Sequence, residues 1–349
     1  MDTPAAAIVV KGLTKSFGSH VAIRDVSFTV AKGEIVGFLG PNGAGKSTTM
    51  RILCGLLAAS KGEAYIGGIS VARSPDLIKR HLGYMPENNP LPEDLRVVEY
   101  LHWRAALKEI PRGKQSKRVN EVLELCDLHR KASRKLIGSL SKGFRQRVGL
   151  ADAILAEPEV VILDEPTIGL DPHQVLIFRQ LLDTLRGKTT IVLSSHILDE
   201  VERSCDRVMI INQGRIVACG TAQDLRSEYC TGTAIKIEFR GDKQALIKAI
   251  ATVHADYVLH AAAPRSANDW LPAQILGNKA PMNDELLLRT LSALPGVELR
   301  AFAREEPSLE TIFIAATKRS WDTELKGRNA SPPASTDAPR PPSTPVATA

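Results

Sequence analysis

Features that would place the chain in a membrane or outside the cell are missing from its 349 residues. No apolar run approaches the roughly 18 consecutive residues that a membrane-spanning helix needs. Residues 1–7 have no basic segment ahead of an apolar one, so the pattern of a signal peptide is absent. The cysteines number only five and form no C-x-x-C pair, which excludes a disulfide framework and a cysteine zinc site. We therefore expect a cytoplasmic protein with buried or partly buried thiols.

Composition is that of an ordinary globular protein, with 44% hydrophobic and 24% charged residues. The length exceeds one typical domain, so two domains and a tail are expected. We place the first domain at residues 1–230 and, because the strand and helix pattern restarts there, a small α+β domain at 231–322. Residues 323–349 are rich in Pro, Ser, Thr and Ala and include six prolines, so they are expected to be a disordered tail.

Charge is unevenly distributed along the chain, whose formal net charge is +6. Residues 101–147 contain 13 Lys or Arg but only 4 Asp or Glu. Most charge runs are solvated helical faces. A basic segment also suits nucleic acid, an acidic protein partner or the lipid headgroups of a membrane surface. Composition leaves these interpretations open.

The hydrophobic pattern predicts buried strands that alternate with helices. The earliest apolar runs, between residues 8 and 30, are short and separated by turn residues, which suggests an antiparallel sheet. Apolar spacing from 97 to 136 is helical and breaks at 111–114, which predicts a basic helical insert at about 88–140. Apolar strands between helices favour an α/β fold whose parallel sheet is buried on both faces. The strands expected in this sheet are 34–39, 160–163 and 189–193, followed by a hairpin at 208–217.

A phosphate-binding motif follows the first of these strands and consists of Gly40, Pro41, Asn42, Gly43, Ala44, Gly45, Lys46, Ser47 and Thr48. It fits G-x-x-x-x-G-K-[ST] and lies between a strand and a helical segment, the context that this motif requires. Glycines let the backbone wrap around an anion, so that N–H groups point inward at the positive end of a helix. Lys46 can reach the β- and γ-phosphates, and the Ser47 hydroxyl can bind Mg²⁺. The alternative is a tight turn that binds nothing.

Two carboxylates end the next apolar strand. Asp164 can hold Mg²⁺ directly or through water, completing a site that begins with Ser47. Glu165 is placed to polarise a water for in-line attack on a γ-phosphate. A lone pair of this kind after a strand is more often a cap or a turn. Because this pair follows a phosphate-binding motif in an α/β pattern, we expect the catalytic role.

Five motifs, in their order along the chain, resemble the ATP-binding-cassette (ABC) ATPases. The resemblance covers residues from about 8 to 225, and the motifs are 40–48, 140–147, 160–166, 169–172 and 195–196. It implies a P-loop NTPase core with an antiparallel β subdomain and a helical insert, followed by the small C-terminal α+β domain. It also implies hydrolysis of ATP with Mg²⁺, and a dimer in which two ATP molecules are sandwiched head to tail.

The resemblance implies roles for residues at matching positions. Ser141 and Gly143 of one subunit would contact the γ-phosphate held by the other, because a hydroxyl and N–H groups at a helix start are good anion ligands. His196 would steady the γ-phosphate and the attacking water, and Asp171 would lie at the dimer seam. Phe17 matches the aromatic residue that stacks on adenine.

Three positions depart from the usual family pattern. Lys142 replaces the first Gly of the L-S-G-G-Q signature and Phe144 replaces its Gln. Glu87 takes the place of a Gln after the nucleotide-sensing strand. Either side chain there offers an oxygen to water or Mg²⁺, but Glu adds a charge that needs compensation. These replacements look like the ATPases that serve ABC-2 type exporters, similar to multidrug-export and gliding-motility ATP-binding proteins.

The sequence therefore predicts the ATPase subunit of a membrane exporter. Its partner would be an ABC-2 type transmembrane permease on a separate chain, at the inner face of the plasma membrane, with no nucleic acid expected. A soluble ABC ATPase acting on ribosomes or DNA is the alternative, but such proteins resemble tandem cassettes or carry a long coiled coil, and this sequence has one phosphate motif and no long heptad run. A module that binds ATP without hydrolysing it is disfavoured by Glu165.

Overall fold

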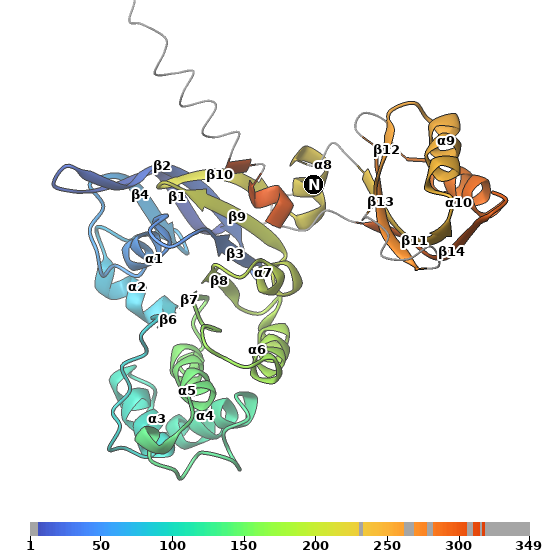
Figure 1. Cartoon of the computed structure of the whole chain (residues 1–349). Helices are drawn as coiled ribbons and strands as arrows, with labels where there is room; N and C mark the ends of the chain where they lie inside the picture. Colours follow the sequence, from blue (N-terminus) through green and yellow to red (C-terminus); the bar gives the residue numbers. More distant parts are fainter. Residues whose placement is uncertain are drawn as a thin grey trace, which may run out of the picture.

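The computed structural model describes residues 6–229, 233–261, 269–277, 282–305, 310–314 and 316–317. The tail expected at 323–349 lies outside these residues. Within them the strands form three sheets, two of which lie together on the left of Figure 1 while the third lies apart on the right. None of the helices described in these ranges is long and apolar enough to cross a membrane.

The first sheet is antiparallel, as expected, with the strand order β2-β1-β4-β5. Strands β1 (Ala6–Phe17) and β2 (His20–Ala31) are joined by a turn at residues 18–19. The sequence suggested several short strands here. The register between β1 and β2 shifts repeatedly, so β-bulges interrupt two long strands instead of ending them. The other strands are β4 (Lys61–Ile66) and β5 (Ile69–Ser70).

The central sheet has six strands in the order β10-β9-β3-β8-β7-β6, and all neighbours are parallel except β9 and β10. Every residue of β3 (Ile35–Leu39), β7 (Val160–Asp164) and β8 (Thr190–Ser195) is buried, as their apolar sequences predict for a sheet covered on both faces. The α/β fold is thereby confirmed. The other strands are β6 (Leu82–Met85), β9 (Arg207–Asn212) and β10 (Arg215–Gly220).

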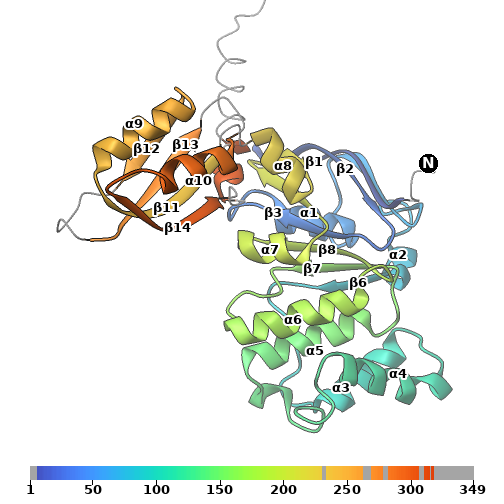
Figure 2. The ribbon, with the colours of Figure 1, turned by 90° about the vertical axis from the view of Figure 1, so that its right-hand side faces the viewer.

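Helices surround this sheet (Figure 2) and connect its strands. They are α1 (Lys46–Leu53), α2 (Pro75–His81), α6 (Pro172–Leu185), α7 (Leu198–Ser204) and α8 (Ala222–Tyr229). The carboxyl ends of β3, β7 and β8 meet at one edge, because Leu39 pairs with Ser195 and Asp164 pairs with Ser194. Ligands of open α/β sheets bind at such an edge. The phosphate motif, the two carboxylates and His196 therefore start from neighbouring strands.

A helical part lies below the central sheet in Figure 1. The break between two helices that was expected at 111–114 lies at residues 108–111, and residues 112–114 already belong to the second helix. Part of the basic excess is used inside this part: Arg118 donates to the carbonyl oxygens of Ile154 (2.8 Å) and Leu155 (2.9 Å), at the C-terminal end of a helix. A cation is favourable there because the helix dipole is negative at that end. The helices are α3 (Val97–Leu107), α4 (Arg112–Leu125) and α5 (Lys142–Ile154), with a short 3₁₀ turn at Ile137–Ser139.

The third sheet is antiparallel, with the order β12-β13-β11-β14, and has a hydrophobic core of its own. The chain order is β-α-β-β-α-β, a split βαβ arrangement. The strand and helix pattern that restarts after residue 231 forms β11 (Thr233–Gly241), α9 (Lys243–Val253), α10 (Asp284–Ser292) and β14 (Val297–Glu305). Two further strands, β12 (Tyr257–Ala261) and β13 (Leu271–Gly277), have weak sequence signals, because both are short and β13 contains a proline.

The last described residues pack against the part of the chain that contains the first two sheets, the first body. Residues 310–314 and 316–317 are helical, and Ile312 and Ala316 are buried in the same core cluster as Ala218 and Leu225. Figures 1 and 2 show this short helix beside α8. The unit formed by the third sheet with α9 and α10 (residues 233–305, the β/α unit) is thus connected to the first body through both of its ends.

Candidate nucleotide site

The phosphate motif forms a tight turn between β3 and α1. Gly45, which precedes α1, has a φ of 107°, and Gly43 has a φ of 79°, conformations that residues with a Cβ rarely adopt. A Cβ on Gly40 would lie 2.4 Å from the carbonyl oxygen of Ile211, so glycine is required there by close packing. The turn brings the first residues of α1 to the wall of a cavity, where the N–H groups at a helix start suit an anion.

Lys46 and Glu165 form a buried ion pair beside this turn. Lys46 Nζ lies 3.2 Å from Glu165 Oε1, and the two side chains are only 6% and 7% exposed. Nζ also donates a hydrogen bond of 2.8 Å to the carbonyl oxygen of Gly40. An incoming phosphate would compete with the Glu165 carboxylate for this ammonium group, since both are anions that seek the same cation.

Asp164 is held by two hydroxyl groups. Its Oδ1 accepts hydrogen bonds from Ser194 Oγ at 2.6 Å and from Ser47 Oγ at 3.2 Å. Ser194 Oγ in turn accepts the backbone N–H of Glu165 at 3.0 Å, so one serine of β8 orients both carboxylate residues. Sequence analysis assigned no role to Ser194. The signal that could have found it is its position at the end of an apolar strand, beside the catalytic candidates.

Glu165 combines backbone strain with tight side-chain contacts. Its φ is 49°, in the left-handed region that residues other than glycine seldom occupy. His196 Nδ1 lies 2.8 Å from its Oε2. Its Oε1 is buried and, apart from the ion pair with Lys46, has no hydrogen-bond donor. Strain of this kind persists only where the surroundings hold the residue, and it is concentrated at functional sites.

The cavity above these residues has a volume of about 520 Å³, within the range of small-ligand sites. Phe17, at the end of β1, lies on its wall with half of its surface exposed. Glu87, which follows β6, is exposed on the same cavity. The cavity is lined by Phe17, His20, Ala22, Pro41, Asn42, Gly43, Gly45, Lys46, Ser47, Thr48, Glu87, Glu165, Ile168 and His196. Of the predicted site residues, Gly40, Ala44 and Asp164 are buried behind this lining.

Ser141, Gly143 and Asp171 do not line the cavity and form a second group at the starts of α5 and α6. Ser141 precedes α5 and makes no side-chain capping hydrogen bond. Asp171 caps α6, its Oδ1 accepting the Gln174 N–H at 2.9 Å. A Cβ on Gly143 would lie 2.1 Å from Gln174 Oε1, so the two helix starts are in contact. The predicted site is therefore split into two parts within one chain.

If Asp164 holds a metal ion as the sequence predicts, replacing Ser194 with Ala is expected to lower ATP turnover by about 10- to 100-fold, the usual effect of removing a residue that orients a metal ligand. The change removes a donor to Asp164 and the acceptor for the Glu165 N–H, while the cavity lining stays intact. Steady-state hydrolysis at increasing Mg²⁺ measures the effect, with S195A as the matched control from the same strand. Equal loss in both variants would contradict a specific role for Ser194.

Comparisons with known proteins identify the class to which these residues belong. The family model described as "ABC transporter" matches residues 23–168. The chain is 36% identical to the Nod factor export ATP-binding protein I of Rhizobium meliloti (strain 1021), over 90% of this chain and 89% of that protein. The chain therefore belongs to the ABC transporter family, and it is an ATP-binding subunit that hydrolyses ATP.

Particular relatives and structures extend this result. The linearmycin resistance ATP-binding protein LnrL of Bacillus subtilis (strain 168) is 31% identical, over 89% of this chain and 98% of that protein. A solved structure of the ATP binding subunit of an ABC transporter is 34% identical and superposes with a TM-score of 0.59, covering 64% of this chain and 93% of that one. The dimeric cassette MJ0796 is 27% identical, with a TM-score of 0.56, covering 61% of this chain and 98% of that one.

Proposed function

We propose that the chain energises an ABC-2 type exporter, and that ATP closes two copies of it head to tail. The observation that carries the dimer is the split site. One group of predicted residues surrounds a cavity, and the other lies at the starts of α5 and α6, outside that cavity. A second copy would supply the missing group to each cavity. A related cassette is dimeric, and export is part of the printed name of the Rhizobium relative.

The donor set fits Mg²⁺. Ser47 Oγ and Asp164 Oδ1 are 3.2 Å apart, and hard oxygen donors of this kind suit that ion. We propose that these two residues hold it, and that the bound ion would neutralise charge on the β- and γ-phosphates.

In the proposed reaction Glu165 is the general base. Once the phosphates take over Lys46, the Glu165 carboxylate is free to accept a proton from water as the water attacks the γ-phosphorus in line. His196, 2.8 Å from the other carboxylate oxygen, orients Glu165 and contacts the γ-phosphate. Phe17, which lines the same cavity, stacks on adenine.

The second copy completes the site in this proposal. The Ser141 hydroxyl, which caps nothing within its own chain, and the Gly143 N–H bind the γ-phosphate held by the partner. Asp171 of each copy lies at the seam between them. Supplying these groups in trans makes hydrolysis depend on closure, as an arginine finger does in other nucleotide hydrolases.

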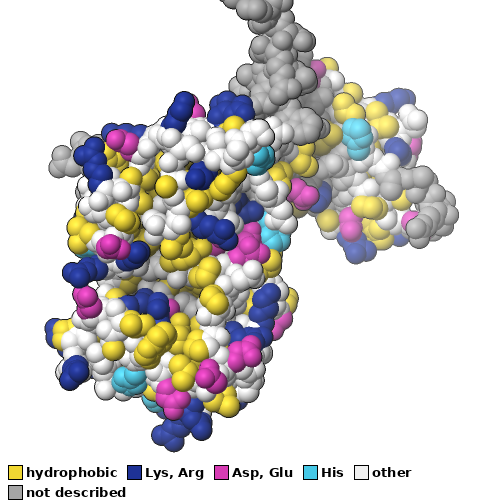
Figure 3. All heavy atoms as spheres, turned by 90° about the vertical axis from the view of Figure 1, so that its left-hand side faces the viewer, with side chains coloured by type: hydrophobic (Ala, Val, Ile, Leu, Met, Phe, Trp, Pro, Cys, Tyr) yellow, Lys and Arg dark blue, Asp and Glu magenta, His cyan; other side chains and the backbone are white. Residues whose placement is uncertain are grey.

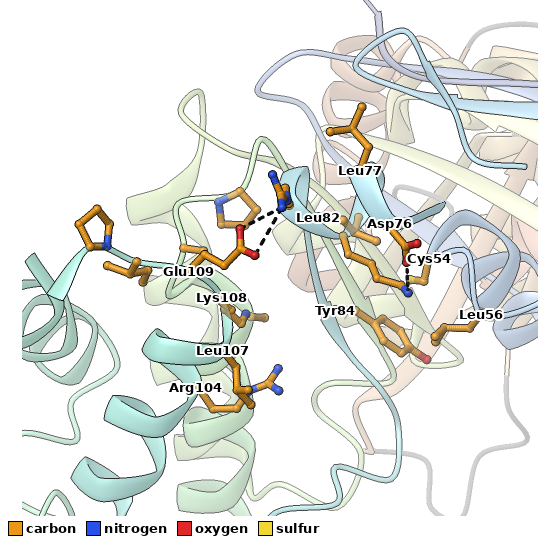
Figure 4. Close-up of a pocket in the computed structure, with 17 residues that line it drawn as sticks. Cys54, Leu56, Asp76, Leu77, Leu82, Tyr84, Arg104, Leu107, Lys108 and Glu109 are labelled. Carbon is orange, nitrogen blue, oxygen red and sulfur yellow. Dashed lines mark hydrogen bonds and ion pairs between the residues drawn. The ribbon is translucent and has the colours of Figure 1, made fainter. Parts of the chain in front are cut away.

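A larger groove, of about 940 Å³, suits a cytoplasmic segment of the membrane partner. It lies between the helical part and α2, as Figure 4 shows, with the ion pair of Arg80 and Glu109 (3.0 Å) across it. Leu56, Leu77 and Leu107 on its walls are each about half exposed. Figure 3 shows this face of the molecule, where hydrophobic side chains gather around a hollow with Lys and Arg beside them.

The groove lies next to the carboxylate site. Cys54 and Tyr84 are part of its wall, and burial raises the pKa of the Tyr84 hydroxyl to about 12. Burial, and then the negative charge of Asp164, raise the pKa of the Cys54 thiol well above its ordinary value. Tyr84 lies on β6, which pairs with β7, the strand that ends at Asp164, so a segment bound in the groove would contact a strand adjacent to the site.

Part of the charge of the basic segment is used within the chain and is not available to a partner. Several of its cations are used internally: Arg104 Nε lies 2.8 Å from the buried Asp152 of α5, and Arg147 lies 3.0 Å from Asp127. Burial lowers the pKa of the Lys108 ammonium, which also faces Asp152. No contact among the described residues favours the ribosome or DNA alternative.

Replacing Leu77 with Asp is expected to weaken association with the membrane partner by about tenfold or more, because a charge would be desolvated in the groove. Leu286, an equally exposed leucine of α10, provides the matched control as L286D. The measurement is binding of the purified full chain to vesicles that contain the candidate permease. Hydrolysis by the chain alone should stay unchanged in both variants.

For this experiment the candidate permease would be sought in the neighbouring gene. A six-helix membrane protein encoded beside this chain would supply it, and a ribosomal context would argue for the alternative function. Equal binding of L77D and the parent to permease vesicles would exclude the groove as the docking site. Equal binding to vesicles with and without permease would contradict the proposed partner itself.

A further inference from the structure

Two charges introduced by the departures from the family pattern have no partner within one chain. Glu87 and Lys142 are both exposed, and neither forms an ion pair with any of the described residues. At both positions the usual family residue is neutral, whereas here the two charges have opposite sign. Such a pair of replacements calls for a common explanation.

Glu87 adds negative charge to a cavity that already has an excess of it. Glu165 also lines the cavity, and the buried Asp164 lies 3.2 Å from the Ser47 hydroxyl. Lys46 is the one Lys or Arg among the residues that line the cavity, and it is already paired with Glu165. Bound ATP would add further negative charge. A cation from outside the chain would therefore be attracted to the neighbourhood of Glu87.

Lys142 is a cation at an unfavourable place within its own chain. It is the first residue of α5, whose first turn contains no acidic residue, and a positive charge is disfavoured at the positive end of a helix. Its ammonium lies against the loop between Glu165 and Asp171: a Cβ on Gly169 would be 2.5 Å from Lys142 Nζ. The cation therefore lies on the surface that the proposed dimer would close.

Phe144, the other replacement in the signature, has a different explanation. The Arg147 guanidinium lies 4.2 Å from the centre of its ring, and the ring packs against the core of the helical part. Arg147 in turn pairs with Asp127 at 3.0 Å. Phe144 thus stabilises α5 from inside its own chain, which leaves Lys142 as the replacement that faces outward.

We infer that Lys142 of one subunit neutralises Glu87 of the other in the ATP-bound dimer. The inference rests on the proposed head-to-tail dimer. Ser141 and Gly143 flank Lys142, so when they reach the γ-phosphate the flexible lysine side chain reaches the rim of the same cavity, where Glu87 stands. Lys142 then acts as an interfacial positioning residue. It offsets the charge of Glu87 and favours closure without binding ATP in its own chain.

Coupling between these residues can be measured as a double-mutant cycle in the full chain, with E165Q present in every variant to prevent turnover. Analytical ultracentrifugation with Mg²⁺ and ATP gives the dimer association constant. K142Q is expected to lower that constant about tenfold in the E165Q parent, but by less than about twofold when E87Q is also present. The difference should shrink as salt is raised, because exposed charges are screened.

Matched controls separate this inference from other effects. K248Q removes an exposed lysine of α9 and should leave dimerisation unchanged with or without E87Q. ATP affinity at protein concentrations below dimerisation should not respond to K142Q. Equal effects of K142Q in both Glu87 backgrounds would overturn the pairing while leaving the dimer intact. Failure of the E165Q parent to dimerise with ATP would contradict the proposed dimer, and the pairing with it.

Discussion

Replacing Glu165 with Gln is expected to lower ATP turnover by about 10² to 10⁴-fold, the range that general-base catalysis contributes. The amide keeps the size of the carboxyl group but cannot accept a proton from the attacking water. It also removes a charge that competes with phosphate for Lys46. ATP binding should therefore be kept or strengthened, and the proposed ATP-bound dimer should accumulate. Phosphate release measures the first effect, and size-exclusion chromatography with ATP measures the second.

Glu200 supplies a control for this experiment. It lies on α7, accepts a hydrogen bond from Thr167 and does not line the cavity, and burial raises the pKa of its carboxyl group. E200Q thus removes a nearby, partly buried carboxylate without touching the proposed reaction centre, and its turnover should stay within about threefold of the parent. Turnover by E165Q at the parental rate would remove Glu165 from the role of general base.

Replacing Lys46 with Ala is expected to weaken ATP binding by at least about 100-fold, because a charge-assisted contact to two phosphates is lost in a low-dielectric site. Stability should fall as well. The change leaves Glu165 as a buried carboxylate without its cation, and breaking a buried ion pair on one side costs about 3–5 kcal/mol. Fluorescence titration with a nucleotide analogue and urea denaturation measure the two effects separately.

The double variant K46A/E165Q distinguishes lost binding from lost folding. Removing both charges eliminates the uncompensated carboxylate, so most of the stability should return while ATP binding stays weak. A K46A protein of normal stability that binds ATP as tightly as the parent would contradict the assignment of Lys46 to the phosphates. If ATP binding recovered together with stability in the double variant, Lys46 would have a structural role and no direct role in phosphate binding.

The central fold could be predicted from sequence because its strands are buried on both faces. Segments such as 160–163 contain only apolar residues, and such strands are typical of a parallel sheet that is covered on both faces. The β/α unit was harder. Strand β12 alternates over only five residues, and Pro272 in β13 argues against a strand although it lies near the end of one. Strand β13 pairs with β11 on one side and with β12 on the other, and this pairing overrides the weak local signals.

The candidate site also contains features that the sequence reveals and features that only the tertiary structure reveals. The phosphate motif requires particular residues for its backbone shape, so it is visible in the sequence. Ser194 and the Lys46–Glu165 pair depend on which strands become neighbours, and neighbours are decided by tertiary packing. The contact of Lys142 with Gly169 likewise arises from α5 and α6 starting side by side.

The helical residues 310–314 and 316–317 change how the β/α unit (residues 233–305) should be regarded. Since Ile312 and Ala316 fill the core that Ala218 and Leu225 also form, the unit is an excursion from the ATP-binding body and not an appendage to it. A chain truncated after α8 would lose part of that core and expose the apolar surface that Ile312 and Ala316 cover. Clean removal of the unit needs two cuts and a bridge between Tyr229 and residue 310. A movement of the unit would therefore reach the ATP-binding body through two chain connections. Two connections can transmit a rotation, whereas a single flexible connection would allow the unit to rotate freely.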